Sequence, residues 1–160
     1  MADILHHFPI KGSPQQVFEA ISTSQGLDSW WTKGSSVTPL QGGEYKLDFG
    51  PGYDWRARVS TWSPDSDFEL TLTESDDDWK GTRLGFHLEQ QDGTTFVSFH
   101  HLNWPQANDH YRISCFLLGD VSSLTKAIRR VWRGSALREQ ARRLAATPAI
   151  AIRNEVKLLP

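Results

Sequence analysis

Histidines offer the widest range of chemistry in this sequence, and four of the six form two adjacent pairs. His6-His7 and His100-His101 lie in stretches where apolar and polar residues alternate, as is typical of β-strands. Neighbouring residues on a strand point to opposite faces, so neither pair can bind one metal ion. The spacings HExxH and CxxC do not occur, and the acidic run Asp76–Asp78 lacks the spaced ligands of a calcium loop. We therefore expect no metal site and no cofactor.

The single cysteine gives little support to nucleophilic catalysis. Cys115 lies in the apolar stretch 113–118, where a cysteine is usually buried and unreactive. A lone cysteine excludes an intramolecular disulfide, and the GxSxG turn of many serine hydrolases does not occur. The sequence identifies no catalytic residue, and whether the protein is an enzyme stays open.

His101 is the candidate for acid–base chemistry. If Val97 and Phe99 face the interior, the alternation places His101 there too. A histidine on an inner face can act as a general base or as the hydrogen-bond partner of a ligand. The alternative is a histidine at the edge of the core, satisfied by a backbone carbonyl or by Tyr111.

The elements that position these residues begin with a strand and two short helical segments. Residues 4–10 alternate as a strand, which Gly12-Ser13-Pro14 ends. Ser13 is a good N-cap and Pro14 suits the first helical position, so a helix follows, with apolar side chains at Val17, Phe18 and Ile21. A second short turn is expected over residues 26–31.

From residue 35 to residue 101, apolar residues recur at every second position. Turn residues such as Gly42-Gly43 and Gln91-Asp92-Gly93 separate the segments. This pattern is typical of an antiparallel sheet with one face packed against a core. Asn108 or Asp109 can then cap a long helix. Its predicted apolar stripe consists of Ser114, Leu117, Val121, Leu124, Ile128 and Val131.

The order of these elements resembles the SRPBCC (START-like, Bet v-like) superfamily, and within it the homologues of the activator of the heat-shock-protein-ninety ATPase. The likeness extends over about residues 3–132. Its motifs are Gly12-Ser13-Pro14-Gln15-Gln16-Val17-Phe18-Glu19-Ala20-Ile21, Trp30-Trp31, Gly42-Gly43-Glu44-Tyr45, Trp62-Ser63-Pro64, Gly81-Thr82-Arg83-Leu84 and His110-Tyr111-Arg112. The resemblance implies an α+β helix-grip fold, in which a curved antiparallel sheet wraps around a long C-terminal helix and two short helices follow the first strand.

Members of this superfamily bind apolar small molecules, act on them as enzymes, or bind chaperones, so the resemblance implies a pocket rather than one reaction. We expect the binding of a small hydrophobic or aromatic ligand in a cavity between the sheet and the C-terminal helix. The alternatives are a cyclase, hydratase or hydrolase that uses the same cavity, and a chaperone-regulating interaction domain.

Aromatic residues suit the wall of such a cavity, because a curved sheet and one helix cannot fill all the space between them. Trp30 and Trp31 are expected near its mouth. The alternative is that the aromatic side chains interlock and leave no space. The expected wall consists of Tyr45, Trp55, Phe86, Phe99, His101, Tyr111 and Leu117.

Charge is distributed unevenly along the chain. Residues 1–125 carry 17 acidic and 8 basic residues, whereas residues 126–160 carry 2 and 9. We expect a START-like domain over residues 1–133 and a basic extension over residues 134–160. The extension could dock on the acidic body of its own or a partner subunit, bind nucleic acid or an anionic surface, or be disordered. Docking, which would make a homodimer, is favoured by the apolar side chains of Ile150, Ile152, Val156, Leu158 and Leu159.

The sequence also favours one cellular compartment. Residues 1–11 do not have the pattern of a signal peptide. No apolar run approaches the roughly 20 residues that span a bilayer. We expect a cytoplasmic protein without membrane or nucleic-acid partners.

Overall fold

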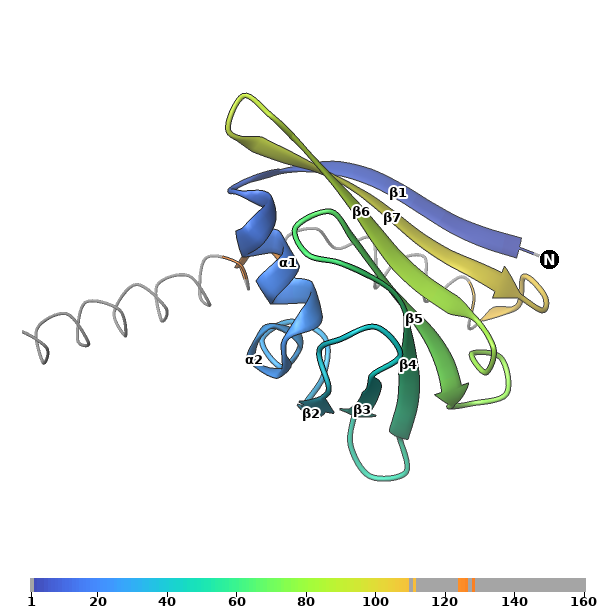
Figure 1. The fold of residues 1–160 in the computed structure, drawn as a ribbon. Helices are drawn as coiled ribbons and strands as arrows, with labels where there is room; N and C mark the ends of the chain where they lie inside the picture. Colours follow the sequence, from blue (N-terminus) through green and yellow to red (C-terminus); the bar gives the residue numbers. More distant parts are fainter. Residues whose placement is uncertain (1, 110, 112–123, 127, 129–160) are drawn as a thin grey trace, which may run out of the picture.

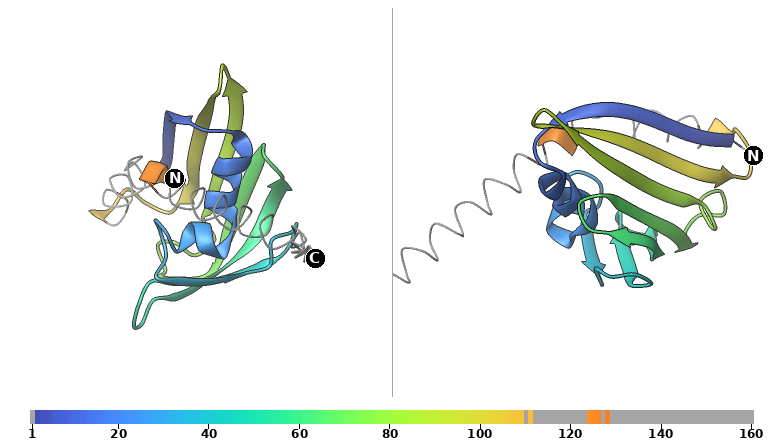
Figure 2. Two further views of the ribbon diagram at one scale, coloured as in Figure 1. Left: turned by 90° about the vertical axis from the view of Figure 1, so that its left-hand side faces the viewer. Right: turned by 45° about the horizontal axis from the view of Figure 1, so that its top comes forward.

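The centre of the protein is an antiparallel sheet bent around two short helices (Figure 1). In this computed structural model, the described residues are 2–109, 111, 124–126 and 128. Within them the sheet has seven strands in the order β1-β7-β6-β5-β4-β3-β2. The strands are β1 (Ala2–Lys11), β2 (Gly34–Val37), β3 (Glu44–Asp48), β4 (Asp54–Ser63), β5 (Asp67–Glu74), β6 (Arg83–Gln91) and β7 (Thr94–Trp104). The helices α1 (Pro14–Ser22) and α2 (Ser24–Leu27) lie on the inner side of the curve (Figure 2).

Helix α1 begins where the sequence predicts it. The Ser13 side chain accepts a hydrogen bond from the backbone N–H of Gln16, and the Gln16 side chain accepts one from the N–H of Ser13. This reciprocal pair satisfies two of the N–H groups that every helix start leaves without a partner. The buried face of the helix, which packs on the sheet, consists of Val17, Phe18, Ala20, Ile21 and Ser22.

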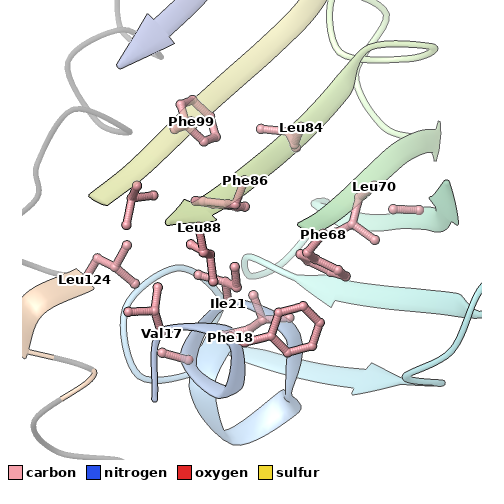
Figure 3. Close-up of a cluster of buried hydrophobic side chains, with 14 of the residues drawn as sticks. Val17, Phe18, Ile21, Phe68, Leu70, Leu84, Phe86, Leu88, Phe99 and Leu124 are labelled. Carbon is pink, nitrogen blue, oxygen red and sulfur yellow. The ribbon is translucent and has the colours of Figure 1, made fainter. Parts of the chain in front are cut away.

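The strands bury alternate side chains, as expected for a sheet that is packed on one face. Along β3, Tyr45 and Leu47 are buried between exposed neighbours, and along β5 Phe68, Leu70 and Leu72 are buried. These side chains pack in one core with the buried face of α1, and Figure 3 shows Phe68 and Leu70 of this core beside Phe18 and Ile21. The predicted antiparallel sheet with one inner face is therefore confirmed.

Strand β1 forms one edge of the sheet and pairs with β7, which is distant in sequence. Phe8 lies opposite Val97, and Ile10 lies opposite Thr95. The Thr95 hydroxyl also donates to the carbonyl of Gly12, 83 residues away, at 2.7 Å. Strand β1 is thus held in place by β7, the last of the described strands in sequence.

Part of the predicted C-terminal helix is described. The Asn108 side chain accepts a hydrogen bond from the backbone N–H of Tyr111 at 2.9 Å, so Asn108 caps a helix start. Leu124 and Ile128, two members of the predicted stripe, are helical and buried in the core, and Figure 3 shows Leu124 beside Val17. The other residues of the predicted helix and the extension 134–160 lie outside the described residues, so the helix stays a prediction. Within the described part of the chain, no helix is long and apolar enough to cross a membrane.

Candidate functional site

His101 faces the interior, as the alternation predicts, and its ring is completely buried. Its Nε2 lies 2.8 Å from the hydroxyl oxygen of Thr82. That hydroxyl donates its single proton to the carbonyl of Trp79, at 2.6 Å. The oxygen of Thr82 must therefore accept from His101, which places the imidazole proton on Nε2 and leaves Nδ1 as a bare acceptor.

Burial decides the charge of this histidine. Loss of solvation, with a smaller contribution from the charge of His100, lowers the pKa of His101 to about 3. The ring is therefore neutral at physiological pH and is a weak base. The ring of His101 contacts the hydroxyl of Thr82, and the hydroxyl of Tyr111 donates to the carbonyl of Asp3 at 2.9 Å.

Aromatic rings surround His101 and continue away from it in both directions. Its ring centroid lies 4.8 Å from those of Trp79 and Trp104. On one side Trp104 contacts Tyr111, and on the other Trp79 contacts Trp55 at 4.9 Å. We call the continuous series of ring contacts the aromatic row, and it consists of Trp30, Trp31, Phe49, Trp55, Trp79, His101, Trp104 and Tyr111.

Three buried nitrogens in the aromatic row make no hydrogen bond to the residues that the structure describes. They are Nε1 of Trp55, Nε1 of Trp104 and Nδ1 of His101. An indole N–H is only a donor, whereas the bare Nδ1 is only an acceptor. Buried polar atoms without partners are rare, because each costs about 1–3 kcal/mol. The row therefore combines apolar ring faces with three unsatisfied directional groups.

A β-bulge explains why Trp104 points inward. Strict alternation after His101 would place residue 103 inside and residue 104 outside. Asn103 instead has φ of 69°, in the left-handed region that asparagine tolerates. Between Ala2 and Ile4 the register against β7 shifts, and Trp104 is completely buried.

Sequence reasoning missed three members of the aromatic row, namely Phe49, Trp79 and Trp104. An asparagine directly before Trp104 was a signal for the bulge, since asparagine favours left-handed backbone. Trp79 lies in the turn between β5 and β6, where no periodic pattern indicates which side chains face inward. Phe49 follows the predicted face of Tyr45 and Leu47, so its place was available from the alternation.

The space beneath α1 and α2 is nearly filled. It leaves about 10 Å³ for the centre of a water molecule, which is roughly the minimum that one water needs. Trp30 is fixed there, because its Nε1 donates to the carbonyl of Ala20 at 3.0 Å. In this part of the protein the aromatic side chains do interlock. The lining consists of Ile21, Leu27, Trp30, Trp31, Phe68, Leu70, Leu84, Phe86 and Phe99.

Tyr45 and Leu117 complete the predicted wall. Tyr45 is completely buried, and its hydroxyl donates to the carbonyl of Ser22 at 2.6 Å. Burial raises the pKa of this hydroxyl. Tyr45 thus joins β3 to the end of α1 and has its hydrogen bond inside the protein. Leu117 lies outside the described residues.

Histidines on the outer face contact carboxylates instead. The ring of His100 reaches Glu69 Oε2 at 2.8 Å, and it passes over Gly85, where a Cβ would collide with it. His87 Nδ1 lies 2.7 Å from Asp67 Oδ1. The hydrogen bond that His87 donates to the Asp67 carboxylate raises the pKa of His87. His100 and His101 thus use opposite faces of β7, and among the described residues no group of three side chains could hold a metal ion.

This sheet, with helices and an aromatic row on its inner face, is the architecture of a START-like protein of the SRPBCC superfamily. Residues 11–113 match the family described as Activator of Hsp90 ATPase homolog 1-like protein. The chain belongs to this family. The resemblance of its motifs to that family is therefore confirmed. No curated protein matches the chain significantly.

Solved structures agree on the fold. The Aha1 dimer from Colwellia psychrerythraea superimposes with a TM-score of 0.72 and 29% identity, over 80% of this chain and 96% of that chain. Protein MLL2253 from Mesorhizobium loti gives 0.71 and 13%, over 81% and 98% of the two chains. The AHSA1-like protein from Aeromonas hydrophila gives 0.65 and 15%, over 81% and 94%. At the two lower identities the likeness concerns the fold alone.

Proposed function

We propose that the protein binds a small hydrophobic or aromatic molecule against the inner face of its sheet, along the aromatic row. The observation that carries this proposal is the group of three buried, unsatisfied nitrogens within a continuous series of rings. Ring faces supply apolar contact area, and a few directional groups orient a ligand. Such a combination is typical of small-molecule sites.

The proposed site lies at the His101 end of the row rather than beneath α1 and α2. The space near Trp30 and Trp31 is filled, and Trp30 already has its hydrogen-bond partner. The nitrogens of Trp55, Trp104 and His101 have none among the described residues. We therefore infer a wall formed by Trp55, Trp79, His101, Trp104 and Tyr111, which Leu117 would extend.

The first test is ligand binding by the full chain. Native mass spectrometry of the purified protein would detect a molecule that co-purifies, and a panel of hydrophobic compounds would be screened by thermal shift. We expect at least one aromatic compound to raise the melting temperature. Trp79→Ala, which removes the central ring of the row, should weaken its binding about tenfold.

Trp62→Ala is the matched control, because Trp62 packs on Phe18 and Phe68 at the other side of the core. Trp62→Ala should lower the melting temperature of the free protein without changing the affinity for the compound that the wild-type protein binds. A panel without any response, or equal losses of affinity in the two variants, would contradict the proposal.

We also propose that residues 134–160 dock on the acidic body of a second copy. The uneven charge supports this, since residues 126–160 carry 9 basic residues and 2 acidic ones. A solved relative is described as a dimer. Light scattering of the full chain and of a chain without residues 134–160 would test the proposal. The full chain should be a dimer that the deletion converts to a monomer, and a full chain that is already monomeric would refute it.

The family description supports a third proposal, an interaction with a chaperone ATPase of the Hsp90 class in the cytoplasm. The test is the ATP hydrolysis rate of the chaperone from the same organism, with and without this protein. An increase that saturates with added protein is expected. An unchanged rate, together with no association in sedimentation, would refute the interaction.

A further inference from the structure

We propose that the aromatic row holds a subsite for a hydroxyl group, and that the ligand is a neutral aromatic alcohol of the phenol type. This inference rests on the proposed function and specifies the chemistry of its ligand. It concerns His101 and Trp104, which lie near the end of β7 with ring centroids 4.8 Å apart and ring planes at 60°.

The pattern of donors and acceptors selects the hydroxyl group. Trp104 offers an indole N–H, and His101 offers the lone pair of Nδ1, because its Nε2 proton is engaged by Thr82. The two rings are neighbours, yet neither nitrogen uses the other as its partner. A hydroxyl group within reach of both nitrogens would satisfy them at once, since its oxygen would accept from Trp104 while its proton would be donated to His101.

Other polar groups fit this pair less well. A carboxylate or phosphate could accept from Trp104, but it would place negative charge beside the lone pair of His101. Because burial keeps His101 neutral, the ring offers no second proton to an anion. A ketone oxygen could also accept from Trp104, but it would place a lone pair beside that of His101. An ammonium group could donate to His101 but could not accept from Trp104.

The rest of the row selects an aromatic carrier for this hydroxyl. Trp79 contacts both His101 and Trp104, at 4.8 and 5.2 Å between centroids, and it contacts Trp55 at 4.9 Å. Flat rings pack on such faces in stacked or edge-on arrangements. A fused aromatic ring with one hydroxyl would therefore place its ring on the row and its oxygen between the two nitrogens.

Water has the same hydrogen-bonding capacity as an alcohol, so the test must separate the two. Isothermal titration calorimetry would compare 2-naphthol, naphthalene and 2-methoxynaphthalene on the wild-type full chain. We expect 2-naphthol to bind about tenfold more tightly than either analogue, because naphthalene lacks the oxygen and the methoxy compound lacks the donated proton.

Two variants test whether the preference for 2-naphthol depends on Trp104 and His101. Trp104→Phe keeps the ring and removes the N–H, and it should reduce the preference for 2-naphthol to about twofold. Trp62→Phe, the same change outside the row, should leave the tenfold preference intact. His101→Phe removes the acceptor and serves as a second variant, with the same expectation as Trp104→Phe.

Each outcome decides the inference. Equal affinities of the three compounds for the wild-type protein would overturn the hydroxyl subsite and leave the proposed apolar site standing, with water alone between the nitrogens. A preference that survives in both Trp104→Phe and His101→Phe would also overturn it. Failure of all three compounds to bind would count against the proposed function itself.

Discussion

The protonation of His101 links one side chain to the pH stability of the whole protein. Its pKa is lowered to about 3 in the folded state, against an ordinary value of 6.5. Below pH 6.5 the unfolded chain binds a proton that the folded chain does not, so the free energy of unfolding decreases as the pH decreases from 6.5 toward 3. The slope approaches 1.4 kcal/mol per pH unit.

His101→Phe should remove this slope. Urea unfolding of the variant and the wild type between pH 4 and pH 7 would give two curves that diverge most at high pH. The loss of the bond to Thr82 shifts the whole curve and does not change the slope. His87→Gln is the control, because the raised pKa of His87 stabilises the protein at low pH and acts in the opposite direction. Parallel curves for the wild type and His101→Phe would refute the assignment.

Gly85 shows a second effect at the scale of one residue. The ring of His100 lies where a side chain at residue 85 would stand. Gly85→Ala should break the bond between His100 and Glu69 and lower the free energy of unfolding by about 1–2 kcal/mol. In a background of His100→Ala the same change should cost little, because the ring is gone. Thermal unfolding of the four proteins measures this coupling, and additive losses would contradict it.

At the scale of elements, the bulge in β7 is the feature to test. Asn103 has φ of 69° and its backbone N–H donates to Asp3 at 3.2 Å. Asn103→Gly should be nearly neutral, since glycine adopts this backbone freely. Asn103→Val should lower the free energy of unfolding by about 1–2 kcal/mol, because a branched side chain resists positive φ. Urea midpoints would measure both, and similar losses for the two variants would speak against the bulge.

The elements themselves were largely predictable, whereas the site was predictable only in part. The start of α1 was predictable because Ser13 and Gln16 exchange hydrogen bonds between side chain and backbone. Strands such as β3 and β5 were predictable from the alternation of apolar and polar residues. The inward direction of His101 followed from the same alternation. The inward direction of Trp104 did not follow from it, because the left-handed backbone of Asn103 reverses the alternation of inward and outward side chains. The direction of Trp79 did not follow either, because Trp79 lies in a turn. The hydrogen bonds of Tyr45 and Tyr111 depend on segments far away in sequence.

At the scale of the whole molecule, β1 and β7, the first and the last of the described strands in sequence, pair with each other. Ile4 is 2% exposed and its neighbour Leu5 is 62% exposed, so adjacent residues on this edge strand have opposite environments. Ile4→Ala should lower the free energy of unfolding by about 3 kcal/mol. Leu5→Ala should change it by less than about 0.5 kcal/mol. Urea unfolding compares the pair, and equal effects would contradict the burial of Ile4 on the inner face of β1.

The pairing of β1 with β7 has a consequence for the chain while a ribosome is still making it. The apolar residues of β1 emerge before those of β7, and their neighbours in β7 follow only after more than 80 further residues, the separation of Gly12 and Thr95 being 83. At translation rates of roughly 5–20 residues per second, β1 waits several seconds or longer without its partner. Nascent chains of this protein would therefore expose Ile4, Phe8 and Ile10 to chaperones or to one another until the last strand leaves the exit tunnel.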